Sequence, residues 1–256
     1  LLSAEASFVD KNTVRLKFVD ERGWRDVTAA NIVIATGTNA TTTDRVPLDG
    51  RRIFVSDDLL KLDHLPRTIA IVGAGVIGLE YAAIFAALGV RVTIIDKRRR
   101  LLPFVDEEII DTLIYHFNQS RAILRLGEEV QTIEPIHDDN GDRVKIHLAS
   151  GKQIITEMAL YSIGRTGATK ALQIDAVNLE SDERGLLKVN EHYQTNAPNI
   201  YAVGDVIGFP SLASTSMEQG RLAACHAFGV KTNHTPELFP YGIYTIPEIS
   251  TVGRNE

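Results

Sequence analysis

The pattern of hydrophobic and polar positions is most regular between Thr68 and Asp96, where two short apolar runs flank a longer helical pattern. Residues 69–72 are apolar and partly β-branched, which predicts a strand buried on both faces of a parallel sheet. Residues 76–88 are rich in Ala, Leu and Ile and predict a helix, and residues 90–95 predict a second strand. The order strand, helix, strand predicts an α/β fold.

Further elements are expected on both sides of this segment. Residues 4–35 have the pattern of a β-meander, and residues 130–160 alternate like a small antiparallel unit. Turn residues fall at 10–12, 21–23, Asn140-Gly141 and Ser150-Gly151. The expected strands are 6–9, 13–18, 31–34, 131–133, 143–148, 153–155, 159–163 and 199–203. Helical patterns cover 104–121 and 214–228, and the capping Ser56 allows a short helix.

Three glycines lie in the turn between the first strand and the helix, in the arrangement Gly73-x-Gly75-x-x-Gly78. Gly73 suits a tight turn, Gly75 lets a pyrophosphate approach the backbone, and Gly78 lets the helix pack closely against the strand. The N-terminus of the helix favours an anion through its unpaired N–H groups and its dipole. Asp96 follows the second strand at the spacing where a carboxylate accepts hydrogen bonds from an adenine ribose. The pattern therefore predicts a dinucleotide site.

Charge and cysteine content narrow the classes of function. Glu80 and Arg91 interrupt the apolar stretch 69–95, and its glycines lack GxxxG spacing, which argues against a membrane span. The net charge of −6 argues against a nucleic-acid partner. Cys225 is the single cysteine, and the histidines lack ligand spacing, so neither a disulfide nor a metal site is expected. This cysteine usage favours a reducing, cytoplasmic compartment.

Glycine recurs at the ends of several expected strands, and the combination resembles a known family. The residues are Gly73-x-Gly75-x-x-Gly78 with Glu80, Ala35-Thr36-Gly37, Gly164-Arg165, and Tyr201-Ala202-Val203-Gly204-Asp205. Together they are similar to the two-nucleotide flavoprotein disulfide reductases. The resemblance runs along the entire chain. It implies a Rossmann-like three-layer NAD(P)-binding domain inserted in a partial FAD-binding domain of the glutathione-reductase type.

The resemblance also implies domain boundaries. Residues 1–45 would end the first FAD-domain segment as a β-meander, and residues 46–166 would form the NAD(P)-binding domain. Residues 167–238 would return into the FAD domain, and residues 239–256 would begin an interface domain. The chain starts without methionine and lacks the family's own FAD glycine motif and cysteine pair. We therefore expect the central half of a longer protein, which the resemblance implies to be a homodimer or a higher homo-oligomer.

For the nicotinamide dinucleotide, the resemblance assigns contacts position by position. Asp96 would bind the adenosine ribose, and Val130 would touch the adenosine through its backbone. Gly164 would approach the nicotinamide half. The residues that would hold the pyrophosphate are Gly73, Ala74, Gly75, Val76, Ile77 and Gly78.

For FAD, the resemblance implies backbone contacts and two acids. Asp205 would accept a hydrogen bond from the ribityl or a nearby sugar, although a helix N-cap is the simpler role for an acid at this place. Glu80 matches a glutamate that pairs with a lysine beside the flavin and is the candidate catalytic residue. An acid stabilised by the helix dipole explains Glu80 equally well. The backbone contacts would come from Ala35, Thr36, Gly37 and Ala213.

The basic run Lys97-Arg98-Arg99-Arg100 directly follows the expected ribose acid. A charge run is usually a solvated loop. At this place, however, Arg98 and Arg100 could bind the 2′-phosphate of NADP, which Asp96 alone would repel. The two features together fit a site that accepts both NAD and NADP, and the sequence leaves the preference open.

Within the family, the likeness is greatest to the branch that transfers hydride between NADPH/NADP and NADH/NAD through FAD. Two alternatives stay open. Dihydrolipoamide dehydrogenases have a similar middle third, and a cysteine pair upstream of this segment would indicate that activity. The piece by itself could also be a non-catalytic nucleotide-binding module, because half of the expected FAD site is missing. We expect the isolated piece to be inactive.

Overall fold

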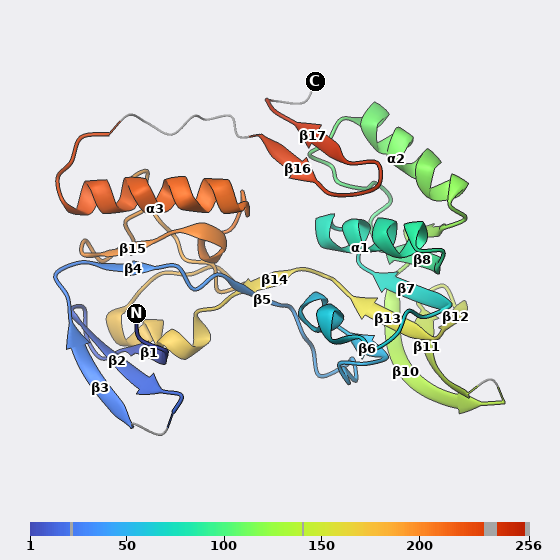
Figure 1. Ribbon diagram of the computed structural model, residues 1–256, viewed down its shortest axis with the longest axis horizontal. Helices are drawn as coiled ribbons and strands as arrows, with labels where there is room; N and C mark the ends of the chain where they lie inside the picture. Colours follow the sequence, from blue (N-terminus) through green and yellow to red (C-terminus); the bar gives the residue numbers. More distant parts are fainter. Residues whose placement is uncertain (21–22, 140, 233–239, 254–256) are drawn as a thin grey trace. The chain divides into compact units, whose positions relative to one another are not determined.

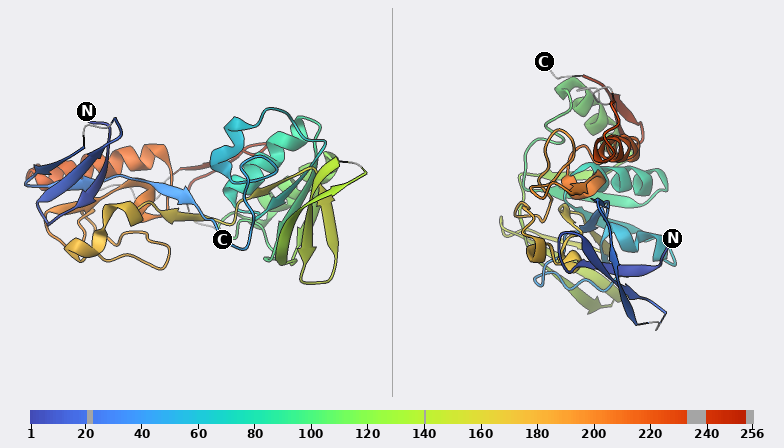
Figure 2. Two further views of the ribbon diagram at one scale, coloured as in Figure 1. Left: turned by 90° about the horizontal axis from the view of Figure 1, so that it is seen from below. Right: turned by 90° about the vertical axis from the view of Figure 1, so that its left-hand side faces the viewer.

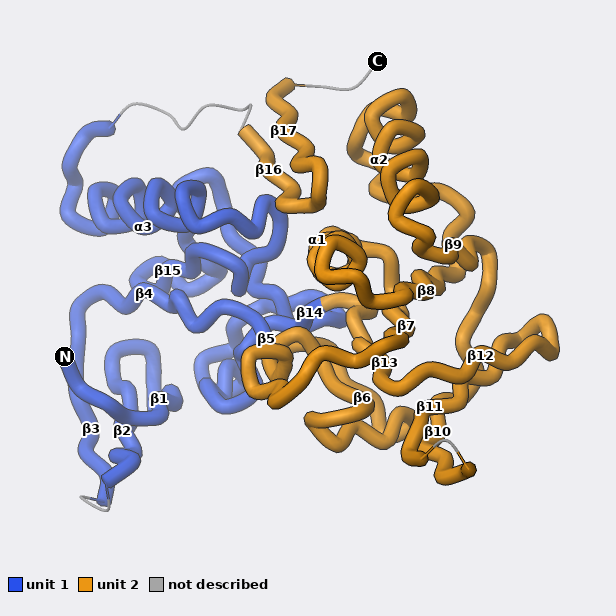
Figure 3. Tube along the Cα trace, turned by 45° about the vertical axis from the view of Figure 1, so that its right-hand side comes forward, with its two compact units in different colours: residues 1–39, 165–237 blue, residues 40–164, 238–256 orange. Residues whose placement is uncertain are grey.

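The computed structural model describes the chain except residues 21–22, 140, 233–239 and 254–256. The chain divides into two compact units, which Figure 3 colours separately. The first contains residues 1–39 and 165–237, and the second contains residues 40–164 and 238–256. Residues 40–164 of the second unit are therefore an insertion in the sequence of the first. The assignment of 1–45, 46–166, 167–238 and 239–256 to named domains stays a prediction.

A five-stranded parallel sheet forms the centre of the second unit, with strand order β6-β13-β7-β8-β9. The strands are β6 (Ile53–Phe54), β7 (Thr68–Val72), β8 (Arg91–Asp96), β9 (Ile123–Leu126) and β13 (Met158–Tyr161). The chain passes from β7 through α1 (Val76–Ala87) to β8, and from β8 through α2 (Glu107–Gln119) to β9. The strand order reverses between β7 and β13, which is where open α/β sheets bind ligands.

Two further layers cover this parallel sheet. The helices α1 and α2 lie on one side, and β10 (Val130–Asp138), β11 (Gly141–Leu148) and β12 (Gln153–Thr156) form an antiparallel sheet on the other (Figure 1). Alternation along β7 explains the arrangement, because Ile71 packs with the helix-side core and Val72 packs with the core under β10–β12. The predicted strand buried on both faces is thus confirmed, and so is the three-layer α/β fold.

Two smaller elements complete the second unit. The predicted short helix is the 3-10 helix η1 (Ser56–Lys61), but Ser56 was wrongly predicted as its cap, because the N-cap residue is Val55 and no described side chain caps the helix. The apolar segment after residue 240 forms a hairpin of β16 (Tyr241–Ile243) and β17 (Ile249–Thr251). Ile243 and Ile249 are buried in the helix-side core. The hairpin therefore belongs to the same core as α1 and α2.

The first unit begins with the meander β1 (Ala4–Phe8), β2 (Thr13–Phe18) and β3 (Trp24–Thr28), drawn in blue in Figures 1 and 2. The predicted strand at residues 31–34 is present, but its assignment to the meander was wrong. Residues 32–34 form β4 (Ile32–Ile34), which pairs in parallel with β15 (Ile200–Ala202). β3 was not predicted, because its exposed residues Trp24, Arg25 and Asp26 do not form an apolar pattern. β4 was predicted as a strand because it is apolar and includes the buried Ile34.

Other parts of the first unit connect these strands. β5 (Thr38–Ala40) pairs with β14 (Arg165–Gly167). The helices are η2 (Lys170–Leu172), η3 (Ile174–Val177), η4 (Gly204–Ile207) and α3 (Ala213–Ala227). Two predicted turns fall partly outside the described residues, at residues 21–22 and Asn140. No helix in the described part of the chain is both long enough and apolar enough to cross a membrane.

Candidate functional site

The three glycines of the β7–α1 turn have different surroundings. A Cβ atom at Gly73 would lie 2.4 Å from the Ser162 carbonyl oxygen, and Gly73 has φ +106°. A Cβ atom at Gly78 would lie 2.0 Å from the Gly73 carbonyl oxygen. At Gly75, by contrast, a Cβ atom would meet no atom of the described residues within 4 Å. Two glycines are thus required by packing, and the third leaves an open approach to the backbone.

The open approach leads to the N-terminus of α1. Gly75 is the N-cap residue, and no side chain of the described residues caps the helix. The N–H groups of Val76 and Ile77, in the first turn, have no partner inside the helix. Together with the helix dipole, they favour an anion at this end of α1. The geometry fits a pyrophosphate without any basic side chain.

Ser162 holds this turn in place, a role that our sequence analysis did not assign. Its N–H donates to the Val72 carbonyl oxygen at 2.8 Å. Its hydroxyl lies 3.1 Å from the same oxygen and 3.0 Å from the Gly73 carbonyl oxygen. The side chain therefore ties the end of β13 to the end of β7. A small hydroxyl residue at a strand end was the only sequence signal.

Asp96 lies at the end of β8 and is 7% exposed. Its Oδ2 accepts the Ala74 N–H at 2.7 Å, which links the acid directly to the glycine turn. Its Oδ1 accepts the Arg98 backbone N–H at 2.8 Å. The Arg98 side chain donates Nε–H to Oδ1 at 2.9 Å and Nη2–H to Oδ2 at 2.7 Å. The acid and the first arginine of the basic run thus form a bidentate ion pair.

This ion pair favours the charged forms of both side chains. Burial opposes the charged form of Asp96, but hydrogen bonds from Arg98 and Ala74 outweigh it and hold its pKa below 3.8. The carboxylate in turn raises the pKa of Arg98. Arg100 has a weaker arrangement, with its Nη2 at 4.0 Å from Glu107 Oε2 and both side chains more than half exposed. The sequence predicted the same role for Arg98 and Arg100, but in the structure Arg98 forms a close bidentate ion pair and Arg100 a longer, exposed one.

Val130 and Gly164 lie in the same unit, at the start of β10 and after the end of β13. Gly164 follows β13, has φ +133°, and its carbonyl oxygen accepts the Thr41 N–H at 3.0 Å. Val130 begins β10 opposite Leu148. No observation tests their predicted contacts with a dinucleotide, so those contacts stay predictions.

Glu80 lies on α1 and has a partner in this chain. Its Oε1 accepts the backbone N–H of Tyr244 at 2.8 Å. The acid therefore connects α1 with the hairpin β16–β17, a contact that the sequence did not predict. Pairing of Glu80 with a lysine beside a flavin stays a prediction.

In the first unit, the parallel ladder of β4 and β15 brings two predicted FAD positions together. Ile34 pairs with Ala202, so the turn Ala35-Thr36-Gly37 and the acid Asp205 follow the carboxyl ends of neighbouring strands. In the described part of the chain, no hydrogen bond or ion pair engages the half-buried Asp205 carboxylate. This acceptor is therefore available to a ligand.

Gln219 of α3 supports the second of these strand ends. This side chain is 4% exposed, and its Oε1 accepts the Gly204 N–H at 2.7 Å. Gly204 has φ +76°. Ala213 begins the same helix, whose N-terminus no side chain caps. Ala213 and Asp205 were predicted from the sequence as site residues, whereas Gln219 was not.

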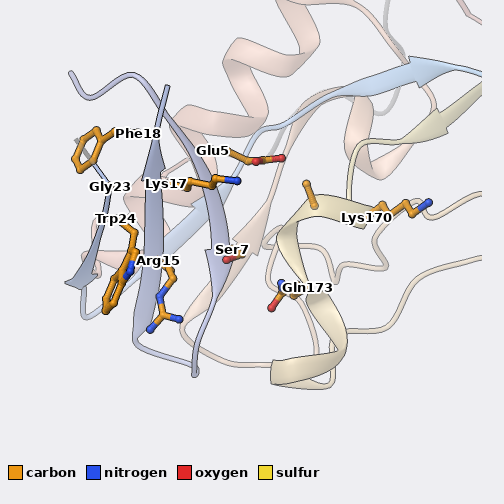
Figure 4. A pocket seen from close by; sticks show the side chains of 10 residues that line it. Glu5, Ser7, Arg15, Lys17, Phe18, Gly23, Trp24, Lys170 and Gln173 are labelled. Atoms are coloured by element: carbon orange, nitrogen blue, oxygen red, sulfur yellow. The ribbon is translucent and has the colours of Figure 1, made fainter. Parts of the chain in front are cut away.

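A cavity of about 620 Å³ lies elsewhere in the first unit (Figure 4). Side chains of the meander line it, including Lys17 and Trp24, together with Lys170 and Gln173. The Arg15 guanidinium carbon lies 4.3 Å from the centre of the Trp24 ring, and Arg15 also pairs with Asp26. None of the site residues predicted from the sequence lines this cavity.

The chain is similar to known proteins in both sequence and fold. The chain matches the family described as pyridine nucleotide-disulphide oxidoreductase over residues 1–220. It is 48% identical over its whole length to soluble pyridine nucleotide transhydrogenases of Photorhabdus laumondii and Serratia proteamaculans. It covers 54% of each, so the chain spans about half the length of these relatives.

Two solved structures are also similar. The HOCl-induced flavoprotein disulfide reductase RclA from Escherichia coli has a TM-score of 0.87 and is 28% identical, with 99% of this chain and 57% of that chain covered. LpdA from Mycobacterium tuberculosis has a TM-score of 0.88 and is 26% identical, with 98% of this chain and 55% of that chain covered. The fold therefore extends over nearly the whole of this chain.

Proposed function

Because this chain belongs to the pyridine nucleotide-disulphide oxidoreductase family, we propose that it forms the nucleotide-binding part of an FAD-dependent transhydrogenase. Such an enzyme transfers hydride between NADPH/NADP and NADH/NAD. The similarity to soluble pyridine nucleotide transhydrogenases along the whole chain supports this reaction. The open backbone at Gly75, between two glycines that packing requires, is the observation that carries dinucleotide binding.

The second unit would hold the nicotinamide dinucleotide. The pyrophosphate would accept hydrogen bonds from the first turn of α1, and Asp96 would face the adenosine ribose. Ser162 keeps the turn in shape for this contact. Gly164 lies across the switch point between β7 and β13, where the nicotinamide half would pass.

The first unit would hold part of FAD. The Asp205 carboxylate, which has no partner among the described residues, is an acceptor suited to a sugar hydroxyl. The N-terminus of α3 at Ala213, which no described side chain caps, is suited to a phosphate. FAD, when bound, supplies an electron acceptor that takes hydride from one nicotinamide and returns it to another. The chain's residues contribute binding and orientation. Glu80 accepts the backbone N–H of Tyr244. Its proposed role is to position a lysine beside the flavin.

Substitution at Gly75 tests nucleotide binding without disturbing the fold. Gly75 has φ −80° and open space around its Cβ position, so Gly75→Ala should fold normally. The added methyl group occupies the pyrophosphate approach. We expect NADH and NADPH to bind about tenfold or more weakly, since overpacking a close contact costs roughly 1–3 kcal/mol. Fluorescence titration of the full chain measures both affinities.

Gly220 of α3 provides the matched control. A Cβ atom there also meets nothing within 4 Å, and the residue lies in the other unit. Gly220→Ala should leave both affinities unchanged. Equal effects of the two substitutions would contradict a dinucleotide site at the β7–α1 turn.

The reaction itself needs a separate measurement. A nucleotide-binding module is the second candidate function, and the open backbone approach at Gly75 supports it. We expect NADPH and NADH binding by the full chain without transfer of hydride from NADPH to thio-NAD. Tight, stoichiometric FAD binding with turnover would refute the module. Reduction of NAD by dihydrolipoamide would refute the transhydrogenase.

A further inference from the structure

The hydrogen-bonding capacity of Asp96 is completely used inside the chain. An ionised carboxylate offers about four lone-pair positions on its two oxygens. Oδ1 accepts two N–H groups from Arg98, and Oδ2 accepts one from Ala74 and one from Arg98. A ribose hydroxyl that needs an acceptor therefore finds no free position on Asp96 as long as the Arg98 side chain stays in place.

The guanidinium of Arg98 keeps donors on its outer edge. Of its five N–H groups, those on Nε and one on Nη2 face Asp96. The two on Nη1 and the second on Nη2 meet no acceptor in the part of the chain that the structure describes. The side chain is 48% exposed, whereas the Asp96 side chain is 5% exposed. The ion pair thus presents positive donors outward and covers its negative partner.

NADP and NAD need opposite hydrogen-bonding groups from the Arg98–Asp96 pair. NADP carries a 2′-phosphate, which needs donors and is recognised by arginine through paired hydrogen bonds. NAD carries two free ribose hydroxyls, which need acceptors such as Asp96. Displacement of the Arg98 side chain would free one lone-pair position on each carboxylate oxygen, one for each hydroxyl. The backbone N–H of Arg98 and that of Ala74 would keep the acid in place.

We propose that Arg98 acts as a gate that determines nucleotide specificity at the adenosine end of the site. A 2′-phosphorylated adenosine binds to the outer edge of the Arg98–Asp96 pair as it stands. An adenosine without this phosphate binds only when Arg98 leaves Asp96. The gate rests on the proposed function, because it requires that the β7–α1 turn bind nicotinamide dinucleotides. It explains how one site with an acid and an arginine can accept both.

Nucleotide fragments test the gate without flavin or turnover. Adenosine 2′,5′-bisphosphate carries the 2′-phosphate, and 5′-ADP lacks it. Calorimetry of the full chain should show that Arg98→Ala weakens binding of the bisphosphate about tenfold, the effect of a lost charge-assisted hydrogen bond. The same substitution should tighten binding of 5′-ADP severalfold, because Asp96 no longer needs to exchange partners. Arg91→Ala, at the exposed opposite end of β8, is the matched control and should change neither affinity.

A second variant changes the acid of the pair, where the first changes the arginine. Asp96→Asn keeps the size of the side chain and releases Arg98. It should bind the bisphosphate at least as tightly as the parent chain and lose affinity for 5′-ADP. Thermal unfolding checks that each variant is folded, and Arg98→Gln replaces Arg98→Ala if the alanine variant is not.

The outcomes separate the gate from the proposed function. Equal weakening of both fragments by Arg98→Ala, or unchanged binding of both, overturns the gate alone. If neither fragment binds to the parent chain, the dinucleotide site is overturned together with the gate. Opposite changes for the two fragments support the gate.

Discussion

At the scale of single residues, the glycine turn shows why three identical residues have different functions. Gly73 and Gly78 must be glycines, because backbone atoms lie too close to them to leave room for a Cβ atom. Gly75 has room for a Cβ atom among the described residues. The sequence predicted these roles because the motif is local and each role follows from chain geometry. Ser162 and the Arg98–Asp96 pair could not be predicted in the same way. Ser162 is far from Gly73 in sequence, and a run of arginines does not show which member turns back to the acid.

Acidification should reveal the Asp96 ion pair as a contribution to stability. The pKa of folded Asp96 lies below its ordinary value of 3.8. The contribution is therefore complete above about pH 4 and is lost as the pH falls through the folded-state pKa. Urea unfolding between pH 7 and pH 3 should show a shallower acid loss for Asp96→Asn than for the parent chain.

Asp26 offers a control for this pH dependence. It pairs with Arg15 on the exposed face of the meander, and this pair also lowers its pKa. Solvent screens an exposed pair, so Asp26→Asn should change the acid profile less than Asp96→Asn does. Superimposable profiles of Asp96→Asn and the parent chain would contradict a stabilising role of the buried acid.

At the scale of elements, prediction depended on how completely an element is buried. β7 was predicted because a strand buried on both faces of a parallel sheet is almost entirely apolar, and α1 was predicted because most of its residues are apolar. β3 was missed because its exposed residues are Trp24, Arg25 and Asp26, and its partner β2 decides its place. β4 was predicted as a strand but placed in the wrong sheet. Its partner β15 lies far along the sequence, and local patterns do not identify distant partners.

The contact between α3 and the end of β15 should carry measurable stability. Gln219→Leu keeps the volume of the side chain but leaves the buried Gly204 N–H without its acceptor. We expect the free energy of unfolding to fall by about 1–3 kcal/mol, the cost of an unsatisfied buried donor. Chemical denaturation measures this change. Gln119→Leu, at the exposed end of α2, is the control and should stay within roughly 0.5 kcal/mol of the parent chain.

At the scale of the whole molecule, the chain consists of two units, and residues 40–164 of the second are inserted in the sequence of the first. Local patterns alone predicted an α/β fold, and the inserted arrangement came from the resemblance of strand-end motifs along the entire chain. The two proposed ligands divide between the units. The residues proposed for the nicotinamide dinucleotide lie in the second unit, and Ala35, Thr36, Gly37, Asp205 and Ala213 lie in the first.

Hydrogen exchange should therefore map the two ligands to different units. NADPH at about 100 times its Kd stabilises its binding state by roughly 2.7 kcal/mol, which corresponds to about 100-fold slower exchange where opening abolishes binding. We expect this protection in peptides that contain residues 73–78 and 96–98, and FAD protection in peptides that contain residues 35–37 and 204–213. In Gly75→Ala, the NADPH protection should disappear and the FAD protection should remain, because the substitution touches only the turn of the second unit. Protection of residues 73–78 by FAD, at the level that NADPH produces, would show that the two sites have been assigned to the wrong units.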